Sequence, residues 1–347
     1  MRSRFMQLPR NVLVREGAIE DVNLICRDLK LSGKALVISD NTTYRIAGKR
    51  ISEVLGDEHE VEEETINNAT FDEVARVSNQ ANEVGATFVL GVGGGRVIDV
   101  AKLVAKEGGV EFLSVPTAAS HDGIASSRAS LKRSEGTASV GARAPLGVIA
   151  DTEIIRKSPY RLTASGCGDV IAKFTAVRDW ELGRDLNGEE YSEYASALSL
   201  MSAKIIADSS ESISDGSEAS IRKVIKALIS CSVAMSIAGS SRPGSGSEHK
   251  FSHALDVIAP RPALHGEQCG VGTIMMTKLQ GGEWQRIKRV LENIGAPVDA
   301  KGLGIDPDLV VDALTRAHRI RESRYTVLGK GLSRSEAFEL ASATGVI

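Results

Sequence analysis

The chain has 347 residues, of which 42% are apolar, 25% charged and 4% aromatic, with a formal net charge of -3 at pH 7. This length is enough for two domains with separate cores, and the scarcity of aromatic residues predicts a mainly aliphatic interior. The slightly negative charge disfavours binding to nucleic acid or to an anionic membrane surface.

Neither a secretory signal nor a membrane-spanning segment is predicted. Residues 1–5 include two arginines, but no apolar run follows them, as it would in a signal peptide. The longest apolar stretch, residues 224–239, contains Lys226 and several serines and is too short to cross a bilayer. The cysteines are widely spaced and form no C-x-x-C pair, so they indicate reduced thiols and a cytoplasmic location. They are Cys26, Cys167, Cys231 and Cys269.

The N-terminal part of the chain alternates short apolar runs with amphipathic segments. Strand-like runs occupy residues 34–40, 59–65, 88–92, 112–116 and 147–150. Helical periodicity occupies residues 42–55, 71–84 and 97–106. This order predicts a parallel sheet covered by helices. Residues 129–142 differ, because two short stretches flank Gly136 and indicate a hairpin with Gly136 in its turn.

After Asp151 the pattern becomes helical, and no clear strand is visible. Helical segments are predicted at residues 191–208, 219–239, 283–294 and 307–320. The stretch 239–247 has the glycine and serine content of a loop. The sequence therefore predicts an α/β N-terminal domain with a parallel sheet, residues 1–158, and an all-α C-terminal domain, residues 159–347.

Three consecutive glycines, Gly93, Gly94 and Gly95, join a predicted strand to a predicted helix. Such a turn lets backbone N–H groups approach an anion, and the helix N-terminus adds its positive dipole end. The turn does not match G-x-G-x-x-G, because Arg96 stands at the last glycine position, and it is not a Walker A loop. It is a candidate pyrophosphate site, although a tight turn without a ligand also fits the pattern.

Three of the six histidines lie close together in the C-terminal half. His249 and His253 are four residues apart, so they share one face of a predicted helix. His265 follows a proline-containing break at residues 259–262, which ends that helix and turns the chain. The spacing places the three imidazoles where they can meet at one metal ion, although such helical pairs also occur without metal.

Three aspartates are further candidates, Asp169 and Asp122 for the site of the histidines and Asp40 for the nucleotide site. Asp169, preceded by glycines and predicted to start a helix, is either a metal ligand or an ion-pair partner of Lys173. Asp122 follows a strand end, where open α/β sheets bind ligands, although a turn aspartate needs no function. Asp40, after the first predicted strand, can bind the hydroxyls of an adenosine ribose or cap the next helix.

These motifs occur in the same order in one family. They are residues 93–102, 115–123, 168–169, 248–253 and 265–267. With them the chain resembles the archaeal-type sn-glycerol-1-phosphate dehydrogenases. That family belongs to the superfamily of iron-dependent alcohol dehydrogenases, glycerol dehydrogenases and dehydroquinate synthases. The resemblance covers nearly the whole chain, and Pro-Thr-Ala-Ala-Ser-His-Asp-Gly at residues 116–123 is its most specific part. Arg96 departs from the lysine or serine more often expected there.

The resemblance implies a dehydroquinate-synthase-like fold and a reversible reduction of dihydroxyacetone phosphate to sn-glycerol 1-phosphate by NADH or NADPH. The product would supply the glycerophosphate backbone of archaeal membrane lipids. Zinc would be held by Asp169, His249 and His265, and the substrate would be contacted by Asp122, His253 and Asp169. The implied cofactor residues are Gly95, Arg96, Val97, Ile98, Asp99, Thr117, Ala118, Ala119, Ser120 and Ser126, to which the glycine turn adds Gly93 and Gly94 and the first strand adds Asp40.

Other interpretations stay open. A glycerol dehydrogenase would reduce unphosphorylated dihydroxyacetone, and a dehydroquinate-synthase-like lyase would use NAD only transiently; a nucleotide-binding protein without catalysis is a third alternative. Lys173, Arg242 and residues 244–246 are candidates for the substrate phosphate, although each can equally face solvent. His253 or Asp122 could supply the proton. A homo-oligomer with a small-molecule substrate is expected, as is common in this superfamily.

Overall fold

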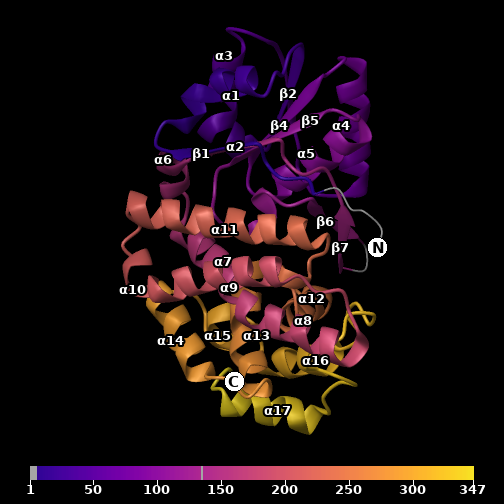
Figure 1. Ribbon diagram of the computed structural model, residues 1–347, viewed down its shortest axis with the longest axis vertical. Helices are drawn as coiled ribbons and strands as arrows, with labels where there is room; N and C mark the ends of the chain where they lie inside the picture. Colours follow the sequence, from indigo (N-terminus) through magenta and orange to yellow (C-terminus); the bar gives the residue numbers. More distant parts are fainter. Residues whose placement is uncertain (1–5, 134–135) are drawn as a thin grey trace. The chain divides into compact units, whose positions relative to one another are not determined.

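The computed structural model describes residues 6–133 and 136–347 (Figure 1). The chain divides into two compact units. Unit 1 comprises Met1–Tyr160 and Ser217–Ser232, and unit 2 comprises Arg161–Gly216 and Val233–Ile347. The predicted division after residue 158 differs from these units in one respect, because Ser217–Ser232 belong to unit 1 although they lie far beyond residue 158. The long helix α11 (Glu218–Ala238) is therefore shared between the two units.

Unit 1 contains a six-stranded parallel sheet in the order β1-β8-β5-β4-β2-β3. Its strands are β1 (Asn11–Arg15), β2 (Lys34–Ser39), β3 (Glu60–Thr65), β4 (Phe88–Gly93), β5 (Glu111–Pro116) and β8 (Gly147–Asp151). The inner strands β4 and β8 are buried at every position, as expected for a parallel sheet covered on both faces. Every predicted sheet strand is present. The prediction missed β1, an edge strand whose side chains are partly exposed, with Val12 at 46%.

The helices of unit 1 follow the predicted alternation. They are η1 (Ala18–Asp21), α1 (Val22–Asp28), α2 (Asn41–Thr43), η2 (Tyr44–Gly48), α3 (Lys49–Leu55), α4 (Phe71–Glu83), α5 (Gly95–Glu107), η3 (Asp122–Ile124) and α6 (Thr152–Arg156). On one side of the sheet, Val37, Leu90 and Leu113 pack in one apolar cluster with Ile25 of α1 and Ile51 of α3. Burial of these aliphatic side chains fixes the strand ends, and with them the turn that follows β4.

A hairpin separate from the sheet is formed by β6 (Arg128–Arg133) and β7 (Gly136–Gly141). The predicted hairpin is therefore present, but its predicted turn residue is wrong. Arg133 pairs with Gly136, so Gly136 is the first residue of β7 and only two residues remain for the connection. Those two residues, Ser134 and Glu135, lie outside the described residues.

Unit 2 is built from helices, and its described residues contain no strand. The helices are α7 (Tyr160–Ile171), α8 (Lys173–Asn187), α9 (Glu193–Asp208), α10 (Ser210–Ile213), η4 (Arg242–Gly244), α12 (Ser247–Ile258), α13 (His265–Leu279), α14 (Trp284–Ile294), α15 (Ala300–Leu303), α16 (Pro307–Ala317) and α17 (Arg334–Ala343). Helix α12 packs against both α13 and α16. Within the described part of the chain, no helix has the length and apolar content needed to span a bilayer.

Candidate functional site

The three histidines predicted to converge do so in unit 2. His249 and His253 lie on α12, the chain breaks after Ile258, and His265 is the first residue of α13. The ring centroids of His249 and His265 are 4.9 Å apart, those of His253 and His265 are 5.8 Å apart, and those of His249 and His253 are 6.4 Å apart. The predicted helix, its break and the convergence of the rings are thus all observed.

Asp169 joins the histidines from α7. Its Oδ1 lies 3.6 Å from Nε2 of His249 and accepts a 2.7 Å hydrogen bond from Nζ of Lys173. The ion-pair alternative for Asp169 is therefore observed, and the carboxylate also borders the imidazoles. The prediction that Asp169 begins a helix is wrong, because it lies in the last turn of α7.

The glycines around Asp169 serve close packing between α7 and α13. A Cβ on Gly168 would lie 2.3 Å from the carbonyl oxygen of Gly266, and a Cβ on Gly266 would lie 1.8 Å from that of Ser165. No side chain fits at such distances, so the two helix backbones can approach only where both carry glycine. This approach brings the carboxylate of Asp169 to the start of α13, where His265 lies.

Electrostatics favour the protonation states that bind a metal. Burial opposes ionisation of Asp169, but Lys173, His265 and His249 together hold the pKa of its carboxyl well below the usual value. Burial, followed by the positive charge of Lys173, lowers the pKa of His249 well below its usual value. Burial and the neighbouring His249 lower the pKa of His265 to about 3. The cluster therefore offers a carboxylate and two neutral imidazoles at neutral pH, which are the forms that coordinate metal ions.

Glu248 orients one of these imidazoles. Its Oε1 lies 2.8 Å from Nδ1 of His249, which leaves Nε2 on the side of Asp169. Glu248 is fully buried and also accepts hydrogen bonds from Thr175 Oγ1 (2.7 Å) and from the backbone N–H of Gly246 (2.6 Å). Carboxylate support of this kind sets the tautomer and ring orientation of a metal-binding histidine. The sequence prediction gave Glu248 no role beyond its place in the motif.

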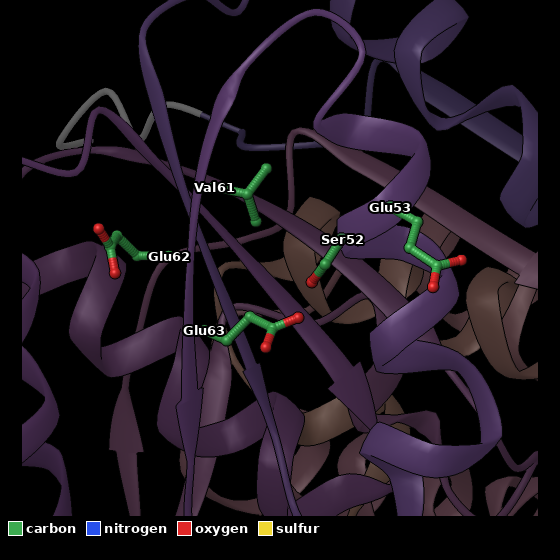
Figure 2. Close-up of a pocket in the computed structure, with 5 residues that line it drawn as sticks. All are labelled: Ser52, Glu53, Val61, Glu62 and Glu63. Atoms are coloured by element: carbon green, nitrogen blue, oxygen red, sulfur yellow. The ribbon is translucent and has the colours of Figure 1, made fainter.

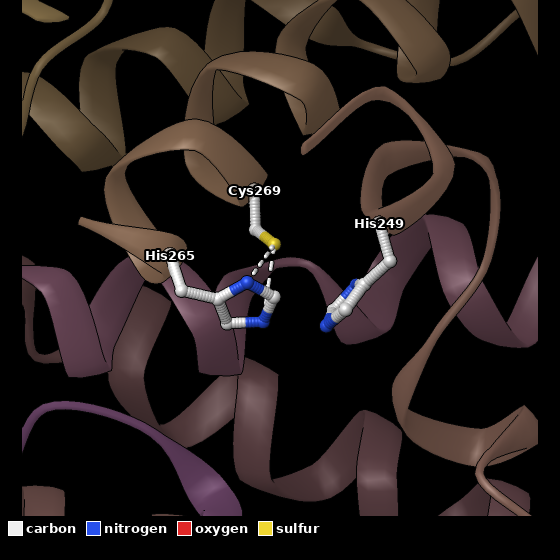
Figure 3. Close-up of side chains that lie close together, drawn as sticks. All are labelled: His249, His265 and Cys269. Carbon is white, nitrogen blue, oxygen red and sulfur yellow. Dashed lines mark hydrogen bonds between the residues drawn. The ribbon is translucent and has the colours of Figure 1, made fainter. Parts of the chain in front are cut away.

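Cys269 is a further residue that the sequence prediction missed (Figure 3). Its Sγ lies 3.6 Å from Nε2 of His265, and ligand atoms of His249, His265 and Cys269 all lie within 4.8 Å of one another. Burial, then the charge of Asp169, raises the pKa of its thiol well above the usual value. Its spacing of four residues from His265 on α13 was a signal that the sequence contained. Two imidazoles, a carboxylate and a neighbouring thiol form a donor set that fits a borderline divalent ion such as zinc.

His253 has a different environment from the other two histidines. Its side chain is 16% exposed, and its Nδ1 lies 3.4 Å from Oδ2 of Asp256. Asp256 also accepts a 2.9 Å hydrogen bond from Gln268 Nε2. Burial raises the pKa of Asp256, but the hydrogen bonds from His253 and Gln268 bring it below the usual value, so the aspartate carries a negative charge beside the ring.

The glycine turn lies in unit 1, between β4 and α5. Gly94 is the N-cap of α5 and no side chain of the described residues caps this end of the helix, so the first N–H groups can meet an anion. A Cβ on Gly94 would find no atom within 4 Å, whereas a Cβ on Gly95 would lie 1.9 Å from Nε2 of His121. Gly94 therefore faces open space, and Gly95 is needed because the ring of His121 packs against it.

Asp40 caps a helix and also lies next to the glycine turn. Its Oδ1 accepts hydrogen bonds from the backbone N–H groups of Thr42 (2.9 Å) and Thr43 (2.8 Å). Its Oδ2 lies 3.7 Å from Nη2 of Arg96. The capping alternative is therefore observed, and the carboxylate still lies beside the residue that follows the three glycines.

Several other predicted cofactor residues have structural contacts. The side chains of Val97 and Ile98 are fully buried in unit 1. Asp99 accepts a 2.9 Å hydrogen bond from the backbone N–H of Ser130 and lies 3.4 Å from Nζ of the buried Lys102. Lys102 Nζ also lies 3.5 Å from the hydroxyl of Ser126. Asp99 and Ser126 therefore help Lys102 to hold the segment that leads into the hairpin.

The remaining predicted residues follow β5, the strand that pairs with β4. Thr117, Ala118 and Ala119 are nearly or completely buried, and the Thr117 N–H donates to the carbonyl of Gly93 at 3.1 Å. This bond joins residues 117–120 directly to the glycine turn. Asp122 begins η3 in unit 1, whereas the histidine cluster with Asp169 belongs to unit 2.

A shallow depression at the edge of the sheet has a different chemistry (Figure 2). It is lined by Ser52, Glu53, Val61, Glu62 and Glu63. Its acids have basic or hydroxyl neighbours: Arg50 lies 3.5 Å from Glu53, Lys34 lies 3.9 Å from Glu62, and the Tyr44 hydroxyl donates to Glu63 at 2.9 Å. An acidic surface of this kind would repel the phosphates of a nucleotide.

The chain is similar to known proteins over its full length. Residues 13–159 match the family model of iron-containing alcohol dehydrogenases. A Methanosarcina acetivorans protein is 55% identical over 346 residues, covering 99% of this chain and 97% of the relative. A Methanothermobacter thermautotrophicus protein is 56% identical over 349 residues, covering 100% of both. Both are named glycerol-1-phosphate dehydrogenase (NAD(P)+). This chain belongs to the glycerol-1-phosphate dehydrogenase family. The resemblance of the sequence motifs is thereby confirmed.

Solved structures confirm the predicted fold class. A probable glycerol dehydrogenase from Sinorhizobium meliloti 1021 superposes with a TM-score of 0.83 at 22% identity, covering 99% of this chain and 100% of that chain. Glycerol dehydrogenase from Schizosaccharomyces pombe gives a TM-score of 0.81 at 18% identity, covering 99% and 91%. Sulfoacetaldehyde reductase from Bifidobacterium kashiwanohense, solved in complex with NAD+, gives 0.76 at 16% identity, covering 99% of each chain.

Proposed function

We propose that this protein catalyses the reversible reduction of dihydroxyacetone phosphate to sn-glycerol 1-phosphate by NADH or NADPH. The observation that carries the proposal is the 55% to 56% identity, over the full chain, to relatives named for this activity. The product supplies the glycerophosphate backbone of archaeal membrane lipids. We assign cofactor binding to an N-terminal domain and metal binding to a C-terminal domain, with their boundary near residue 158.

The proposed metal is zinc, held by Asp169, His249 and His265. When bound, a divalent ion polarises a ketone oxygen as a Lewis acid. The carboxylate of Asp169 supplies the negative charge of the ligand set, and Glu248 keeps Nε2 of His249 directed at the cluster. Two neutral imidazoles and one carboxylate are a ligand set typical of catalytic zinc, which supports this choice of metal. To test the choice of zinc, the protein is expressed in a medium with equal amounts of zinc and iron, and its metal content is measured. Iron in stoichiometric amount would contradict zinc as the bound metal.

The proposed cofactor site is the turn after β4 together with residues 117–120 and Ser126. The uncapped N–H groups at the start of α5 would bind the diphosphate, and Arg96 would add a positive charge. Asp40 would bind ribose hydroxyls through the oxygen that it does not use as a cap. The guanidinium of Arg96 beside it offsets the repulsion of a 2′-phosphate, which is consistent with the use of either cofactor.

Asp122 and His253 are proposed to contact the substrate, with Asp169 close to it. Nε2 of His253 would donate the proton to the oxygen at C2 as the alcohol forms. Asp256 lies 3.4 Å from Nδ1 and leaves Nε2 as the ring nitrogen that can act on the substrate, which supports His253 over Asp122 as the proton donor. A solvent isotope effect and a pH-rate profile that disappear in His253→Gln but persist in Asp122→Asn would agree with this assignment; the reverse result would exchange the two roles.

One assay separates this function from its alternatives. Zinc-loaded protein is offered dihydroxyacetone phosphate or dihydroxyacetone with NADH or NADPH, and the product is analysed on a chiral column. We expect oxidation of the cofactor with the phosphorylated ketone and a single product, sn-glycerol 1-phosphate. Activity with dihydroxyacetone alone would instead identify a glycerol dehydrogenase. A lyase would turn over a phosphorylated sugar acid without net oxidation of the cofactor.

A homo-oligomer is also proposed, and the cytoplasmic location stays a prediction. On α9, Tyr194, Met201 and Ile205 are 83%, 52% and 42% exposed. They are seven and four residues apart, so they share one helix face, and an exposed apolar stripe of this kind is typical of a surface that another protein covers. Light scattering of the wild type and of Met201→Glu should give a dimer or larger assembly that the substitution weakens. A wild-type monomer would contradict the proposal.

A further inference from the structure

A group of basic side chains lies in unit 2 around the loop that leads into α12. Lys250, in the first turn of α12, is only 4% exposed, and its Nζ lies 3.4 Å from the carbonyl oxygen of His318. Arg324, in the segment after α16, donates to the carbonyl of Ser245 (2.7 Å) and to the hydroxyl of Ser241 (2.8 Å). Among residues 6–133 and 136–347, no carboxylate lies within 4.0 Å of either cation.

The phosphate candidates named from the sequence differ from these two. Nζ of Lys173 is occupied by Asp169 at 2.7 Å, and Arg242 forms two hydrogen bonds with Glu189, of 2.6 and 2.7 Å. Carboxylates thus already neutralise both. Even so, Nη1 of Arg242 is buried and makes no hydrogen bond to any described residue. The loop therefore has more donors and more positive charge than the described residues around it satisfy.

This concentration of positive charge is costly for the folded chain. Burial, then the charges of Arg321 and Arg242, lowers the pKa of Arg324 to about 9. Arg321 itself has φ of 49°, a left-handed conformation that residues other than glycine rarely adopt and that concentrates at functional sites. The charge of Arg321 also acts on His249, and Lys250 follows His249 directly in α12, so these two cations lie near the proposed metal ligands.

One buried carboxylate holds the two segments that carry the cations. Asp179 accepts hydrogen bonds from the backbone N–H of Ser247 (2.6 Å) and of Val327 (2.8 Å). Ser247 is the first residue of α12 and lies three residues before Lys250. Val327 lies three residues after Arg324. The positions of both cations relative to His249 are therefore fixed by the fold, as a preformed binding site requires.

We propose that Lys250 and Arg324, with Arg321 beside them, bind the phosphate group of the substrate. This inference rests on the proposed function and assigns the residues that select a phosphorylated three-carbon ketone over an unphosphorylated one. The planar guanidinium can donate to two phosphate oxygens at once, and the ammonium acts as a point charge. A phosphate dianion would supply the negative charge that neither cation receives from a contacting carboxylate.

The test compares Lys250→Gln and Arg324→Gln with Arg286→Gln, all as zinc-loaded, full-length protein. Arg286, on α14, is a matched control because its side chain is 57% exposed and its ion pair with Asp208 is 3.7 Å long. For each protein we measure KM and kcat with dihydroxyacetone phosphate, competitive inhibition by inorganic phosphate, bound zinc and melting temperature. Since Arg324 also holds the loop, Lys250→Gln keeps the test decisive if Arg324→Gln does not fold.

We expect KM and the inhibition constant for phosphate to rise by about 10- to 100-fold in the two variants, in line with the loss of a charged hydrogen bond. Zinc content and the control should stay as in the wild type. The inference is overturned if KM and phosphate inhibition match the control, or if zinc falls in step with activity, because the cations would then only support the metal cluster. A different result would contradict the proposed function: a wild-type protein that oxidises NADH only with dihydroxyacetone. In that case the inference would fail as well.

Discussion

The glycine turn of unit 1 and the histidine cluster of unit 2 are built in opposite ways. The turn is made of consecutive residues and offers backbone N–H groups, with Gly94 facing open space and Arg96 61% exposed. The cluster is made of side chains from three helices and is almost closed to solvent, with Asp169 at 0% and His249 at 7% exposure. A backbone site needs only its local conformation, whereas the cluster depends on how α7, α12 and α13 pack.

This difference predicts how each site responds to substitution. Loss of one ligand in the cluster should remove a whole function, because the remaining buried charges keep their desolvation cost without their partner. Loss of one contact in the turn should only weaken binding, since neighbouring N–H groups remain. The effects of substitution should therefore decrease from the metal ligands, through the packing of their helices, to the glycine turn.

The largest effect is expected for the proposed metal ligands. His249→Ala and His265→Ala should lose bound zinc and lower kcat/KM by about a thousandfold, roughly 4 kcal/mol of transition-state stabilisation. His253→Ala should keep zinc and lose turnover by about a hundredfold or more, because only proton transfer is removed. Metal analysis together with steady-state kinetics checks both. NADH affinity, followed by fluorescence, serves as the control and should not change. Equal loss of zinc in all three variants would contradict this division of roles.

The next effect concerns the packing that creates the cluster. Gly168→Ala would place a methyl group 2.3 Å from the carbonyl of Gly266, which must push α7 away from α13. We expect a loss of about 1–3 kcal/mol in the free energy of unfolding, and weaker zinc binding as Asp169 moves away. Chemical denaturation and zinc titration measure the two effects.

Gly270→Ala is the matched control for this packing test. Its Cβ would meet Leu291 at 3.4 Å, an ordinary contact, and alanine is favoured over glycine inside a helix by about 1 kcal/mol. Its stability should therefore be unchanged or higher. If Gly168→Ala behaves like this control, close approach of the two helices is not what positions Asp169.

How far the sequence predicts each region follows from the same contrast. The turn can be predicted from the sequence because the strand, the glycines and the helix are neighbours in the chain, and the structure places them as expected. The convergence of His249, His253 and His265 can also be predicted, because a helical spacing and a proline-containing break determine it. The spacing could not select the metal ligands among them; the family resemblance was needed for that proposal.

Other features could not be read from local patterns. Gly168 suggested a helix start beside Asp169, yet it lies inside α7 because α13 approaches closely there. That contact joins residues nearly a hundred positions apart, so no local propensity encodes it. That no carboxylate of the described residues contacts Lys250 or Arg324 is likewise a property of the packed unit. Cys269 is the exception, because its spacing of four residues from His265 already indicates in the sequence that the two side chains share a helix face.

A smaller effect is expected at the glycine turn. In Gly94→Ala the added methyl group meets no described atom within 4 Å, so the protein should fold and bind zinc as before. We expect the dissociation constant of NADH to rise about tenfold, since the methyl group would occupy the space through which the diphosphate approaches. Gly108→Ala, at the other end of α5, is the matched control, because its Cβ would make an ordinary 3.4 Å contact. Unchanged NADH affinity in Gly94→Ala would remove the turn from the cofactor site.

The last expected effect is a dependence on pH, which builds up gradually over several pH units and should distinguish the two regions. The pKa of His265 is lowered to about 3 in the folded protein, and that of His249 is lowered as well, mainly by burial. An unfolded chain binds protons at its histidines near pH 6.5, so between about pH 6.5 and 3 it holds more protons than the folded metal-free protein. The free energy of unfolding must therefore fall as the pH falls through this window, by at most about 1.4 kcal/mol per pH unit for each imidazole. Backbone N–H groups do not titrate, so NADH affinity of the protein that remains folded should show no matching step. Denaturation of metal-free wild type and of His265→Gln from pH 7 to pH 4 measures the difference. The slope should be smaller in the variant, and equal slopes would show that the buried imidazole is not the source.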